Sequence, residues 1–481
     1  MAGKLGIGTK AGYGVGAAAE AGVLIAFNAF NMIFYQNVLG LSGALAGMAV
    51  SISLMFDAVS DPLVGAISDR WRSRMGRRHP FLYVASIPFG ACFYLIYAPP
   101  AFILGSQALL FSWLMVLTIM LRTFQTFYHV PHLALGAELA TEYKERSVLM
   151  SYNSIFGMVG GVAVSVAGFQ YLGAASGRID DVGAYANMGA VVGLLGAAII
   201  VLTAVATAKR GAQLSKVPDL PPFSTKQFIA EIRSCLQNEN YRYLLIGLVC
   251  LGPFLGVRET LATHLTRFFW EVPVADIGKL ALAVPPAFVL MFLFVPRMHQ
   301  RYSKRALMLG GLTVAAISAG APITLRLLGL LPDNSDPFIY RMLLVERFVF
   351  YLGISTLTMS VMSALGDVAD EHDLATGRRQ EGVFYSARSF FGKVTQAAGH
   401  LVAGIALDLI GFESGSKVGE VPEDVLVMLG LVDGPVAAAF GLGAAYFYAR
   451  YKIDPARHAE IRESLAKRHS ARPPEGAAAE S

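Results

Sequence analysis

Cysteine and charge are both scarce in this chain of 481 residues. Its 3 cysteines, Cys92, Cys235 and Cys250, lie at spacings that match no metal site, so neither a metal cluster nor a disulfide framework is expected. Charged residues make up only 15% and apolar residues 55%, and the mean hydropathy is +0.53. That balance excludes a soluble protein of several domains and indicates a chain that crosses a membrane many times.

Apolar runs of about 20 residues, the length that crosses ~30 Å of hydrocarbon, follow one another along the chain. The sequence therefore predicts an all-α membrane protein with twelve transmembrane helices. They are expected near residues 13–39, 43–68, 80–99, 107–136, 148–173, 185–208, 242–270, 276–297, 305–329, 339–366, 381–411 and 423–451.

One long polar stretch, residues 209–241, divides the twelve runs into six and six. We interpret it as a central loop between an N-terminal half, 1–208, and a C-terminal half, 242–451, with a polar tail at 452–481. Two related six-helix halves are typical of transporters. No cleavage pattern follows the first run, so the segment MAGKLGIGTK is interpreted as a retained start rather than a signal peptide.

Lysine and arginine gather at both termini, in the central loop and in the loops after the even-numbered runs. By the positive-inside rule both termini are expected in the cytoplasm, which for a bacterial protein means insertion in the inner membrane. This asymmetry accounts for the net charge of +5, so the expected partners are the lipid bilayer and a small molecule, with no nucleic acid. A monomeric state is compatible with the sequence.

Asp57 and Asp61 form the most informative pair in the sequence. At a spacing of four they lie one turn apart on one helix face, where two ionised carboxylates repel each other. A charged side chain at membrane depth costs at least ~2.5 kcal/mol, so the pair predicts a site for a cation or a proton. Pro62 cannot donate to the carbonyl of Ala58, which leaves one more oxygen nearby for a hard cation such as Na⁺.

Two similar charged segments follow the second and the tenth predicted helices. Each carries a glycine, an acidic residue, a second glycine and paired arginines, and each is a candidate gate at the cytoplasmic face; simple salt bridges and helix capping are the alternative. The residues are Gly65, Asp69, Arg70, Gly76, Arg77 and Arg78 in the first segment, and Asp367, Asp370, Gly377, Arg378 and Arg379 in the second.

Polar residues also follow helical spacing on three other predicted helices, the first, the fourth and the eleventh. In lipid such stripes must face the protein interior or water, so they are candidates for a substrate path. Hydrogen bonding between neighbouring helices is the alternative for any one of them. The candidate substrate-binding or coupling residues are Glu20, Asn28, Asn31, Tyr35, Arg122, Gln125, Tyr385, Ser389, Lys393 and Gln396, and His129 is a candidate for the cation site.

The runs DAVSDPLVGAISDRWRSRMGRRHPFL and GDVADEHDLATGRRQEGVFYSARSFFGKVTQA resemble signatures of the glycoside–pentoside–hexuronide:cation symporters. This family of the major facilitator superfamily includes the melibiose permease and, more distantly, the sodium-dependent lysophosphatidylcholine transporters. The resemblance implies a major facilitator fold, cation-site acids at Asp57 and Asp61, and a coupling lysine at Lys393. His129 stands where the melibiose permease has an acid, so H⁺ remains an alternative to Na⁺.

The expected function is therefore cation-coupled symport of a sugar or glycoside by alternating access, without catalytic residues, cofactor or bound metal beyond the coupling ion. A lysophospholipid or another amphiphile is the alternative substrate. A remote alternative is a magnesium-dependent enzyme similar to the intramembrane prenyltransferases, because a D-x-x-x-D pair on a membrane helix can hold a metal diphosphate. That alternative requires a second acid-rich motif at the same depth.

Overall fold

The computed structural model describes residues 5–140, 142–175, 177–213, 233–377 and 381–470. Within these residues the protein is helical and has no strand. The first group of helices comprises α1 (Ile7–Met32), α2 (Gly43–Arg70), α3 (His79–Tyr97), α4 (Gln107–Leu139), α5 (Tyr143–Gly173) and α6 (Val182–Gln213). The second group comprises α8 (Glu239–His264), α9 (Val274–Ile277), α10 (Val284–Met298), α11 (Lys304–Leu327), α12 (Pro337–Thr376), α13 (Glu381–Leu409), α14 (Glu423–Leu431) and α15 (Ala437–Tyr448).

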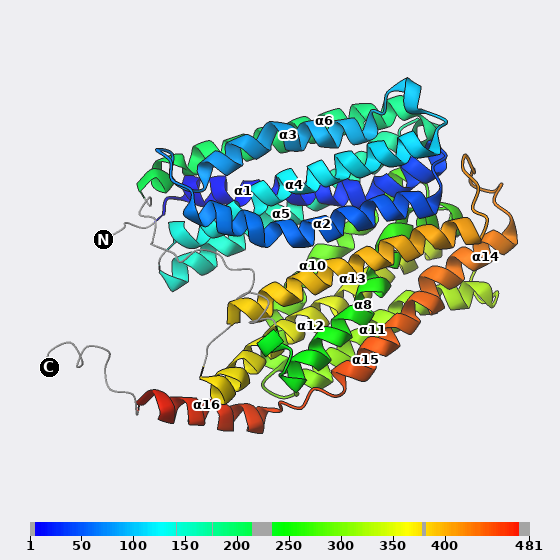
Figure 1. The fold of residues 1–481 in the computed structure, drawn as a ribbon. Coiled ribbons are helices and arrows are strands. Elements are labelled where there is room, and N and C mark those ends of the chain that lie inside the picture. The colour runs from blue at the N-terminus through cyan, green and yellow to red at the C-terminus, as the bar shows by residue number, and fades with distance from the viewer. Residues whose placement is uncertain (1–4, 141, 176, 214–232, 378–380, 471–481) are drawn as a thin grey trace.

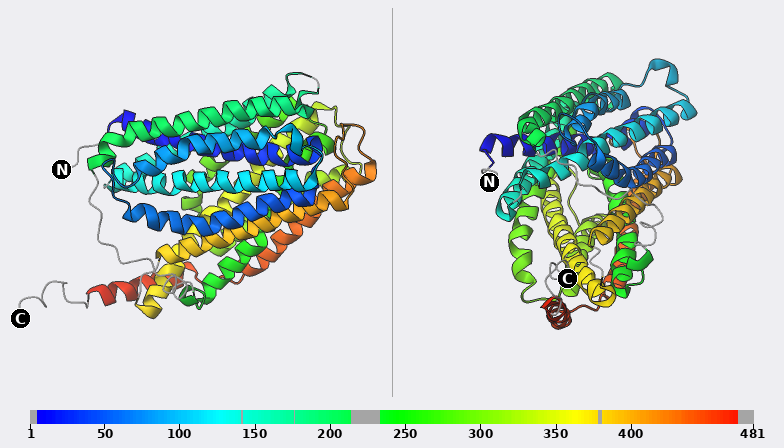
Figure 2. Two further views of the ribbon diagram at one scale, coloured as in Figure 1. Left: turned by 45° about the horizontal axis from the view of Figure 1, so that its top comes forward. Right: turned by 60° about the vertical axis from the view of Figure 1, so that its left-hand side comes forward.

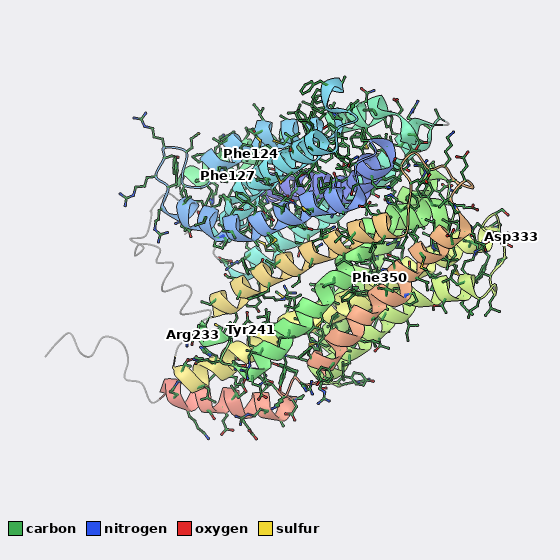
Figure 3. The ribbon with its side chains drawn as sticks, turned by 45° about the vertical axis from the view of Figure 1, so that its right-hand side comes forward. Phe124, Phe127, Arg233, Tyr241, Asp333 and Phe350 are labelled. Atoms are coloured by element: carbon green, nitrogen blue, oxygen red, sulfur yellow. The ribbon has the colours of Figure 1, made fainter. Side chains whose placement is uncertain are left out.

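The two groups lie side by side and meet along α2 and α13 (Figure 1). Their helices spread apart toward the end of the molecule that carries the N- and C-termini, as two further views also show (Figure 2). Aromatic side chains pack within each group (Figure 3): Phe127 lies against Phe81, and Phe350 against Phe254, with ring centroids 6.1 Å apart in both pairs.

Eleven helical segments of the described chain are long and apolar enough to cross a membrane. Helix α13 is not among them although it has 29 residues, because Lys393, Gln396 and His400 make its middle polar. The predicted all-α membrane fold is confirmed, whereas the count of twelve spans is not. Large apolar side chains on the outside, such as Ile87, Leu194 and Leu442, suit contact with lipid.

Small residues allow α2 and α13 to approach closely. A Cβ atom added to Gly43 would lie 2.6 Å from the carbonyl oxygen of Gly404, and one added to Gly47 would lie 2.5 Å from that of His400. Such contacts are typical of helix packing in membranes, where association depends on close van der Waals contact rather than on the hydrophobic effect.

Hydrogen bonds join the two groups at the end away from the termini. The Asp408 carboxylate of α13 accepts bonds from Ser42 Oγ and from the backbone N–H groups of Gly43 and Ala44, which begin α2. Gln36 lies in η1 (Ile33–Val38), a π-helical turn that ends the first span. Its Nε2 donates to the carbonyl of Phe412, 2.9 Å away, and its Oε1 lies 3.0 Å from His264 Nε2.

The first span of each group ends in a π-helical turn. These turns are η1 after α1 and η4 (Leu265–Phe269) after α8. A π turn carries one extra residue per hydrogen bond and therefore rotates the residues beyond it.

Candidate functional site

Asp57 and Asp61 of α2 lie beside Lys393 of α13, so the pair joins the two helix groups. Lys393 Nζ donates to Asp57 Oδ2 at 2.8 Å and to Asp61 Oδ2 at 2.5 Å. The side chain of Asp57 is buried, and those of Asp61 and Lys393 are about one quarter exposed. One ammonium group thus lies between the two carboxylates that the sequence predicts to require a cation.

Thr126 of α4 completes this cluster. Its Oγ1 lies 2.7 Å from Asp57 Oδ1 and 3.0 Å from Asp61 Oδ1. A hydroxyl carries a single hydrogen, so Thr126 donates to one carboxylate at a time. The sequence stripe on α4 did not include Thr126, and its spacing of four from Arg122 is the signal that would have found it.

A second cluster lies on α1 and α4 within the first group. His129 Nδ1 is 2.7 Å from Glu20 Oε1, and Gln125 Nε2 donates to the same oxygen at 3.4 Å. Arg122 Nη1 donates to Gln125 Oε1 at 3.5 Å, and its guanidinium lies over the ring of Phe27 at 5.7 Å. Four polar side chains predicted from the sequence therefore lie together.

A third cluster again joins the two groups, through Glu259 of α8. Its carboxylate accepts hydrogen bonds from Asn28 Nδ2 of α1 and, at 2.6 Å, from Gln396 Nε2 of α13. His400 Nε2 lies 3.9 Å away from Glu259 Oε2. None of the polar stripes predicted from the sequence includes Glu259, so its place among the site residues is seen only in the structure.

The three clusters surround one cavity of about 250 Å³. Its lining holds four carboxylates and two permanently charged cations, so negative charge exceeds positive by two when His129 and His400 are neutral. A site with this balance attracts a cation. The polar lining residues are Glu20, Asn28, Asp57, Asp61, Arg122, Gln125, Thr126, His129, Glu259, Lys393, Gln396 and His400.

Four residues predicted to line the path lie outside this lining. Tyr35 is buried in the core and its hydroxyl donates to the carbonyl of Ile96 at 2.7 Å, because the π-helical turn η1 rotates it away from the α-helical stripe. Asn31 is buried beyond the cavity on α1. Tyr385 and Ser389 are exposed on α13, and the Tyr385 hydroxyl is 3.4 Å from the Met362 carbonyl.

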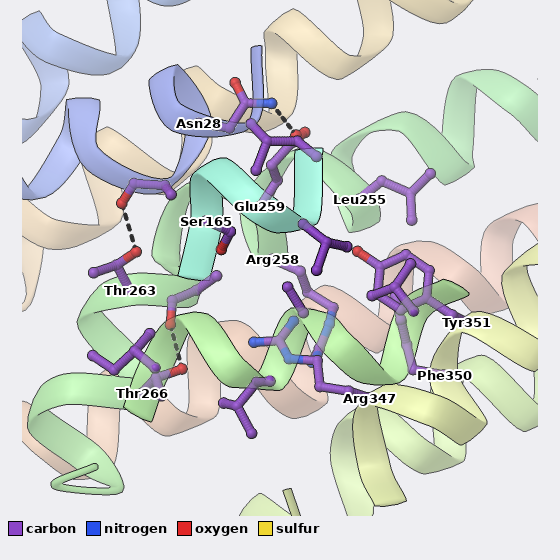
Figure 4. A pocket seen from close by; sticks show the side chains of 18 of the residues that line it. Asn28, Ser165, Leu255, Arg258, Glu259, Thr263, Thr266, Arg347, Phe350 and Tyr351 are labelled. Atoms are coloured by element: carbon purple, nitrogen blue, oxygen red, sulfur yellow. Dashed lines mark hydrogen bonds between the residues drawn. The ribbon is translucent and has the colours of Figure 1, made fainter. Parts of the chain in front are cut away.

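A larger cavity of about 420 Å³ adjoins the first and shares Asn28, Glu259 and Gln396 with it (Figure 4). It lies among α1, α5, α8, η5 (Gly278–Ala283), α10 and α12. Most of its wall is apolar. The apolar lining residues are Ile25, Ala29, Met158, Val162, Phe169, Leu255, Ala262, Ile277, Leu280, Ala281, Val284, Phe350 and Ile354.

A buried ion cluster forms part of the wall of this larger cavity. Arg258 Nη2 donates to Glu346 Oε1 and Arg258 Nη1 to Asp433 Oδ2, both at 3.0 Å, and Arg347 Nε lies 3.8 Å from Glu346 Oε2. Two guanidinium groups thus balance two carboxylates. Asp433 lies in the π-helical turn η6 (Val432–Val436), and no pattern in the sequence indicated its partner.

The first candidate gate segment forms a network of ion pairs and hydrogen bonds at the C-terminal ends of α2 and α4. The Arg78 guanidinium bonds to Asp69, to Ser68 Oγ at 2.7 Å and to Glu138 Oε1 at 2.9 Å. Arg77 also contacts Glu138, at 2.8 Å. Arg70 Nη1 donates to the carbonyl of Ala66; Gly65 lies within α2, and Gly76 has a φ of 87° that favours glycine.

The second segment is held by the helix that follows the last span. Lys304 Nζ bonds to Asp367 Oδ1 at 2.6 Å, and His458 of α16 (Pro455–Ser470) lies 3.2 Å from Asp367 and 3.3 Å from Asp370. Burial and the nearby Asp367 carboxylate raise the pKa of Tyr451, whose hydroxyl donates to that carboxylate. Gly377 ends α12 with a φ of 72°; Arg378 and Arg379 lie outside the described residues.

These acidic residues are therefore engaged by basic partners at the end of α12, away from Asp57 and Asp61. Among the described residues, no group of three or more His, Cys, Asp or Glu side chains has the geometry of a metal site.

Two packed groups of membrane-crossing helices with an ion-paired polar cavity between them define the class of secondary transporters. The chain belongs to the family described as "MFS/sugar transport protein", whose model matches residues 12–455. The resemblance noted from the sequence is confirmed.

Several known proteins are similar to this chain over its length. The putative glycoside/cation symporter YagG of Escherichia coli is 26% identical, with 96% of this chain and 95% of that protein covered. The isoprimeverose transporter of Lactiplantibacillus pentosus is 22% identical, with 91% and 88% covered. The crystal structure of the nucleoside transporter NupG shares the fold, with a TM-score of 0.63, 12% identity, and 92% and 100% covered.

A more local similarity reaches an animal protein. The sodium-dependent lysophosphatidylcholine symporter 1-A of Danio rerio is 33% identical over 140 residues, which cover 28% of this chain and 25% of that protein.

Proposed function

We propose that this chain is a cation-coupled symporter of a sugar or glycoside. Membership of the sugar transport family and the similarity to proteins named as glycoside/cation symporter and isoprimeverose transporter support the substrate class. The observation that carries the coupling is the position of Lys393, a cation from one helix group held by Asp57 and Asp61 of the other.

Lys393 acts as a stand-in for the transported cation. When Na⁺ or H⁺ binds to Asp57 and Asp61, it replaces the charge of the Lys393 ammonium, whose two bonds to α2 then break. Thr126 Oγ1, which lies within 3.0 Å of both carboxylates, supplies a further oxygen for a bound Na⁺. Cation binding thereby loosens one link between α2 and α13.

The substrate binds in the polar cavity between the same helices. Its hydroxyl groups exchange hydrogen bonds with the side chains that bond to one another across the groups, Asn28, Glu259 and Gln396, and with Glu20, Arg122 and Gln125 of the first group. Substrate and cation then favour the same rearranged cavity, which is the thermodynamic basis of coupling.

Alternating access follows from movement of residues 1–208 against residues 242–451. The contacts around Asp408 and Gln36 close the end away from the termini, and the groups spread apart at the other end, as in Figure 1. With both termini in the cytoplasm of a bacterial cell, this is an inward-open state. The ion pairs of Asp69 with Arg78 and of Asp367 with Lys304 form the gate at the cytoplasmic side. One chain contributes both helix groups that surround the substrate path, so a monomer suffices for transport.

Na⁺ and H⁺ make different demands on the site. The oxygens of Asp57, Asp61 and Thr126 suit Na⁺, whereas the contact between His129 and Glu20 offers a place for a proton near neutral pH. The proposal includes both ions. The ion whose imposed gradient drives substrate accumulation identifies the coupling cation.

A lysophospholipid is the second candidate substrate, favoured by the apolar wall of the larger cavity and by the local similarity to the lysophosphatidylcholine symporter. Its phosphate would need a cation. Lys393 is already bonded to two carboxylates, which a phosphate would have to displace, and Arg122 is the other cation of the polar cavity. A sugar, which is neutral, has no such requirement.

A thermal-shift screen of the purified protein against sugars, glycosides and lysophospholipids, with and without Na⁺ and at two pH values, identifies the substrate. We expect a sugar or glycoside to stabilise the protein, with a larger effect when the coupling cation is present. If a lysophospholipid stabilised the protein and no sugar or glycoside did, the substrate would be a lysophospholipid and the proposed sugar or glycoside would be wrong.

Transport of the identified compound is then measured in proteoliposomes with imposed Na⁺ or H⁺ gradients. Asp57→Asn should abolish accumulation against the substrate gradient, because one carboxylate of the cation site is lost. Asp276→Asn, at an exposed ion pair with Lys279, is the matched control and should retain accumulation. Uphill accumulation by the Asp57→Asn protein would contradict the coupling role.

A further inference from the structure

The larger cavity has a mixed lining, with apolar side chains over much of its wall. A sugar ring presents hydroxyl groups around its edge, and each buried polar group requires a hydrogen-bond partner. Helices α5, α8 and α12 contribute the apolar residues Met158, Val162, Leu255, Phe350 and Ile354 to this wall. The hydroxyls of Thr263 and Thr266, which also line it, already donate to the carbonyls of Ala29 and Ala262. Such a wall gains free energy when an apolar group displaces water from it.

The two cavities are continuous in their lining. Asn28, Glu259 and Gln396 line both, and the bonds from Asn28 and Gln396 to Glu259 mark the boundary between the two cavities. Figure 4 shows the bond of Asn28 with Glu259. A molecule whose sugar hydroxyls bind to these three side chains would extend any substituent on its far side into the 420 Å³ cavity. Cavities of roughly 300–1,000 Å³ are the usual size for binding small organic molecules.

Charge in the larger cavity is balanced. Arg258 bonds to Glu346 and Asp433, and Arg347 lies beside Glu346, so the guanidinium groups of this wall have carboxylate partners. Glu259 adds a negative charge at the boundary. The wall therefore favours a neutral group over a carboxylate or phosphate, which would meet the carboxylates without a surplus of cations.

From these observations we infer that the substrate is an amphipathic glycoside, with its sugar in the polar cavity and a neutral apolar aglycone in the cavity between α5, α8 and α12. This inference rests on the proposed transport of a sugar or glycoside. It adds the chemical nature of the aglycone, which membership of the sugar transport family does not specify. Specificity for the aglycone then resides in residues such as Val162 that do not touch the cation site.

Pairs of neutral glycosides that differ only in aglycone test the assignment. Methyl and hexyl glycosides of glucose, galactose and xylose, in both anomeric forms, are compared as competitors and as ligands in thermal-shift titrations. For the sugar that binds, each added methylene should strengthen binding by about fourfold until the cavity is filled. Equal affinity of the methyl and hexyl members would overturn the inference while leaving sugar transport intact.

Matched substitutions on α5 separate the cavity from general partition of the alkyl chain into lipid. Val162 lines the cavity, whereas Val159, nearly one turn away on the same helix, is exposed on the outside. Val162→Ser should lower the ratio of hexyl to methyl affinity by about threefold or more, and Val162→Phe should reverse the preference by filling the space. Val159→Ser should leave the ratio unchanged.

The possible failures are distinct. A ratio that is insensitive to Val162 but above one assigns the preference to lipid or detergent and overturns the aglycone site. A protein stabilised by no glycoside of any pair, but by another compound with a cation, overturns the proposed function and the inference with it.

Discussion

Lys393 Nζ and Asp61 Oδ2 are 2.5 Å apart although their residues belong to different helix groups, separated by 332 positions in the chain. The same ammonium reaches Asp57 Oδ2 at 2.8 Å. Two carboxylates one helical turn apart repel each other, and the ammonium offsets this repulsion at membrane depth. If this pair is the proposed cation site, the site and a link between the two helix groups are one structure, and cation binding would affect the contact between α2 and α13.

Replacement of Lys393 by alanine should separate cation binding from transport. Without the ammonium, Asp57 and Asp61 bind Na⁺ or H⁺ more tightly because the competing charge is gone, and coupled accumulation of substrate is lost. Titration of thermal stability with Na⁺ at fixed pH, and with pH in the absence of Na⁺, measures the first effect. Proteoliposome uptake measures the second.

Lys279→Ala is the control for this substitution, since Lys279 forms a half-exposed pair with Asp276 and does not line the polar cavity. It should leave both titrations and uptake unchanged. A Lys393→Ala protein with unaltered cation affinity would show that the ammonium does not compete for the aspartate pair.

Replacement of His129 by glutamine should reveal whether a proton takes part. Histidine has an ordinary pKa of about 6.5, so it changes charge between about pH 5 and 8, whereas glutamine does not change charge in this range. If the contact of His129 with Glu20 carries the coupling proton, the uptake profile of His129→Gln flattens across this range. Initial uptake rates at constant membrane potential provide the measurement.

His299 at the end of α10 supplies the matched control. Burial, together with the nearby Lys304, lowers the pKa of His299 below its ordinary value, so the imidazole is already neutral above about pH 6.5. His299→Gln should therefore keep the pH profile of the unchanged protein. A profile that stays steep in His129→Gln would assign the titration to another group, with Glu20, Asp57, Asp61 and Glu259 as the remaining acids of the cavity.

The central part of the site was accessible from the sequence because it depends on local spacing. Asp57 and Asp61 are four residues apart, and a charge at membrane depth requires a partner, so the need for a cation could be stated without the fold. That Lys393 is this cation depended on the resemblance to a family. Spacing along one helix carries no information about which helix lies opposite.

Glu259 shows where such reasoning ends. Arg258 and Glu259 are adjacent in the sequence and carry opposite charges. On a helix, neighbours point about 100° apart, so Arg258 reaches Glu346 and Asp433 while Glu259 faces Asn28 and Gln396. The partners come from three other helices and a π-helical turn, and the packing that assembles them is a property of the fold.

Regular periodicity also fails at irregular backbone. The prediction placed Tyr35 on the same face as Asn28, which holds for an unbroken α-helix, but η1 begins at Ile33 and turns Tyr35 into the core. The tail was predicted as polar, and residues 455–470 form α16, whose Ile461 and Leu465 are buried. Two apolar residues in a highly charged segment are too weak a pattern to predict that contact.

Removal of Arg258 should destabilise the second helix group strongly. Arg258→Met leaves Glu346 and Asp433 buried without their shared cation, which costs about 3–5 kcal/mol for an ion cluster of this kind. The triple variant Arg258→Met, Glu346→Gln, Asp433→Asn should recover most of the loss because the uncompensated charges are gone. Thermal unfolding of the purified proteins in one detergent compares them, and a triple variant as unstable as the single one would indicate loss of packing rather than of charge balance.

The close contact between α2 and α13 allows a test of the proposed inward-open state. A Cβ atom at Gly43 would lie 2.6 Å from the Gly404 carbonyl oxygen, so Gly43→Val forces the helices apart where the molecule is closed, at a cost of about 1–3 kcal/mol. This clash destabilises the inward-open state, in which α2 and α13 are in contact at this point. The fraction of molecules in the outward-open state should therefore increase. A cysteine at Leu24, which lines the polar cavity, should react faster with a label added from the side away from the termini in the Gly43→Val background. Gly310→Val, at a helical position on α11 with no heavy atom within 4 Å of the added Cβ, is the control and should leave the labelling rate unchanged. If the labelling rate were unaltered in Gly43→Val as well as in Gly310→Val, closure of this end would not depend on the contact between Gly43 and Gly404.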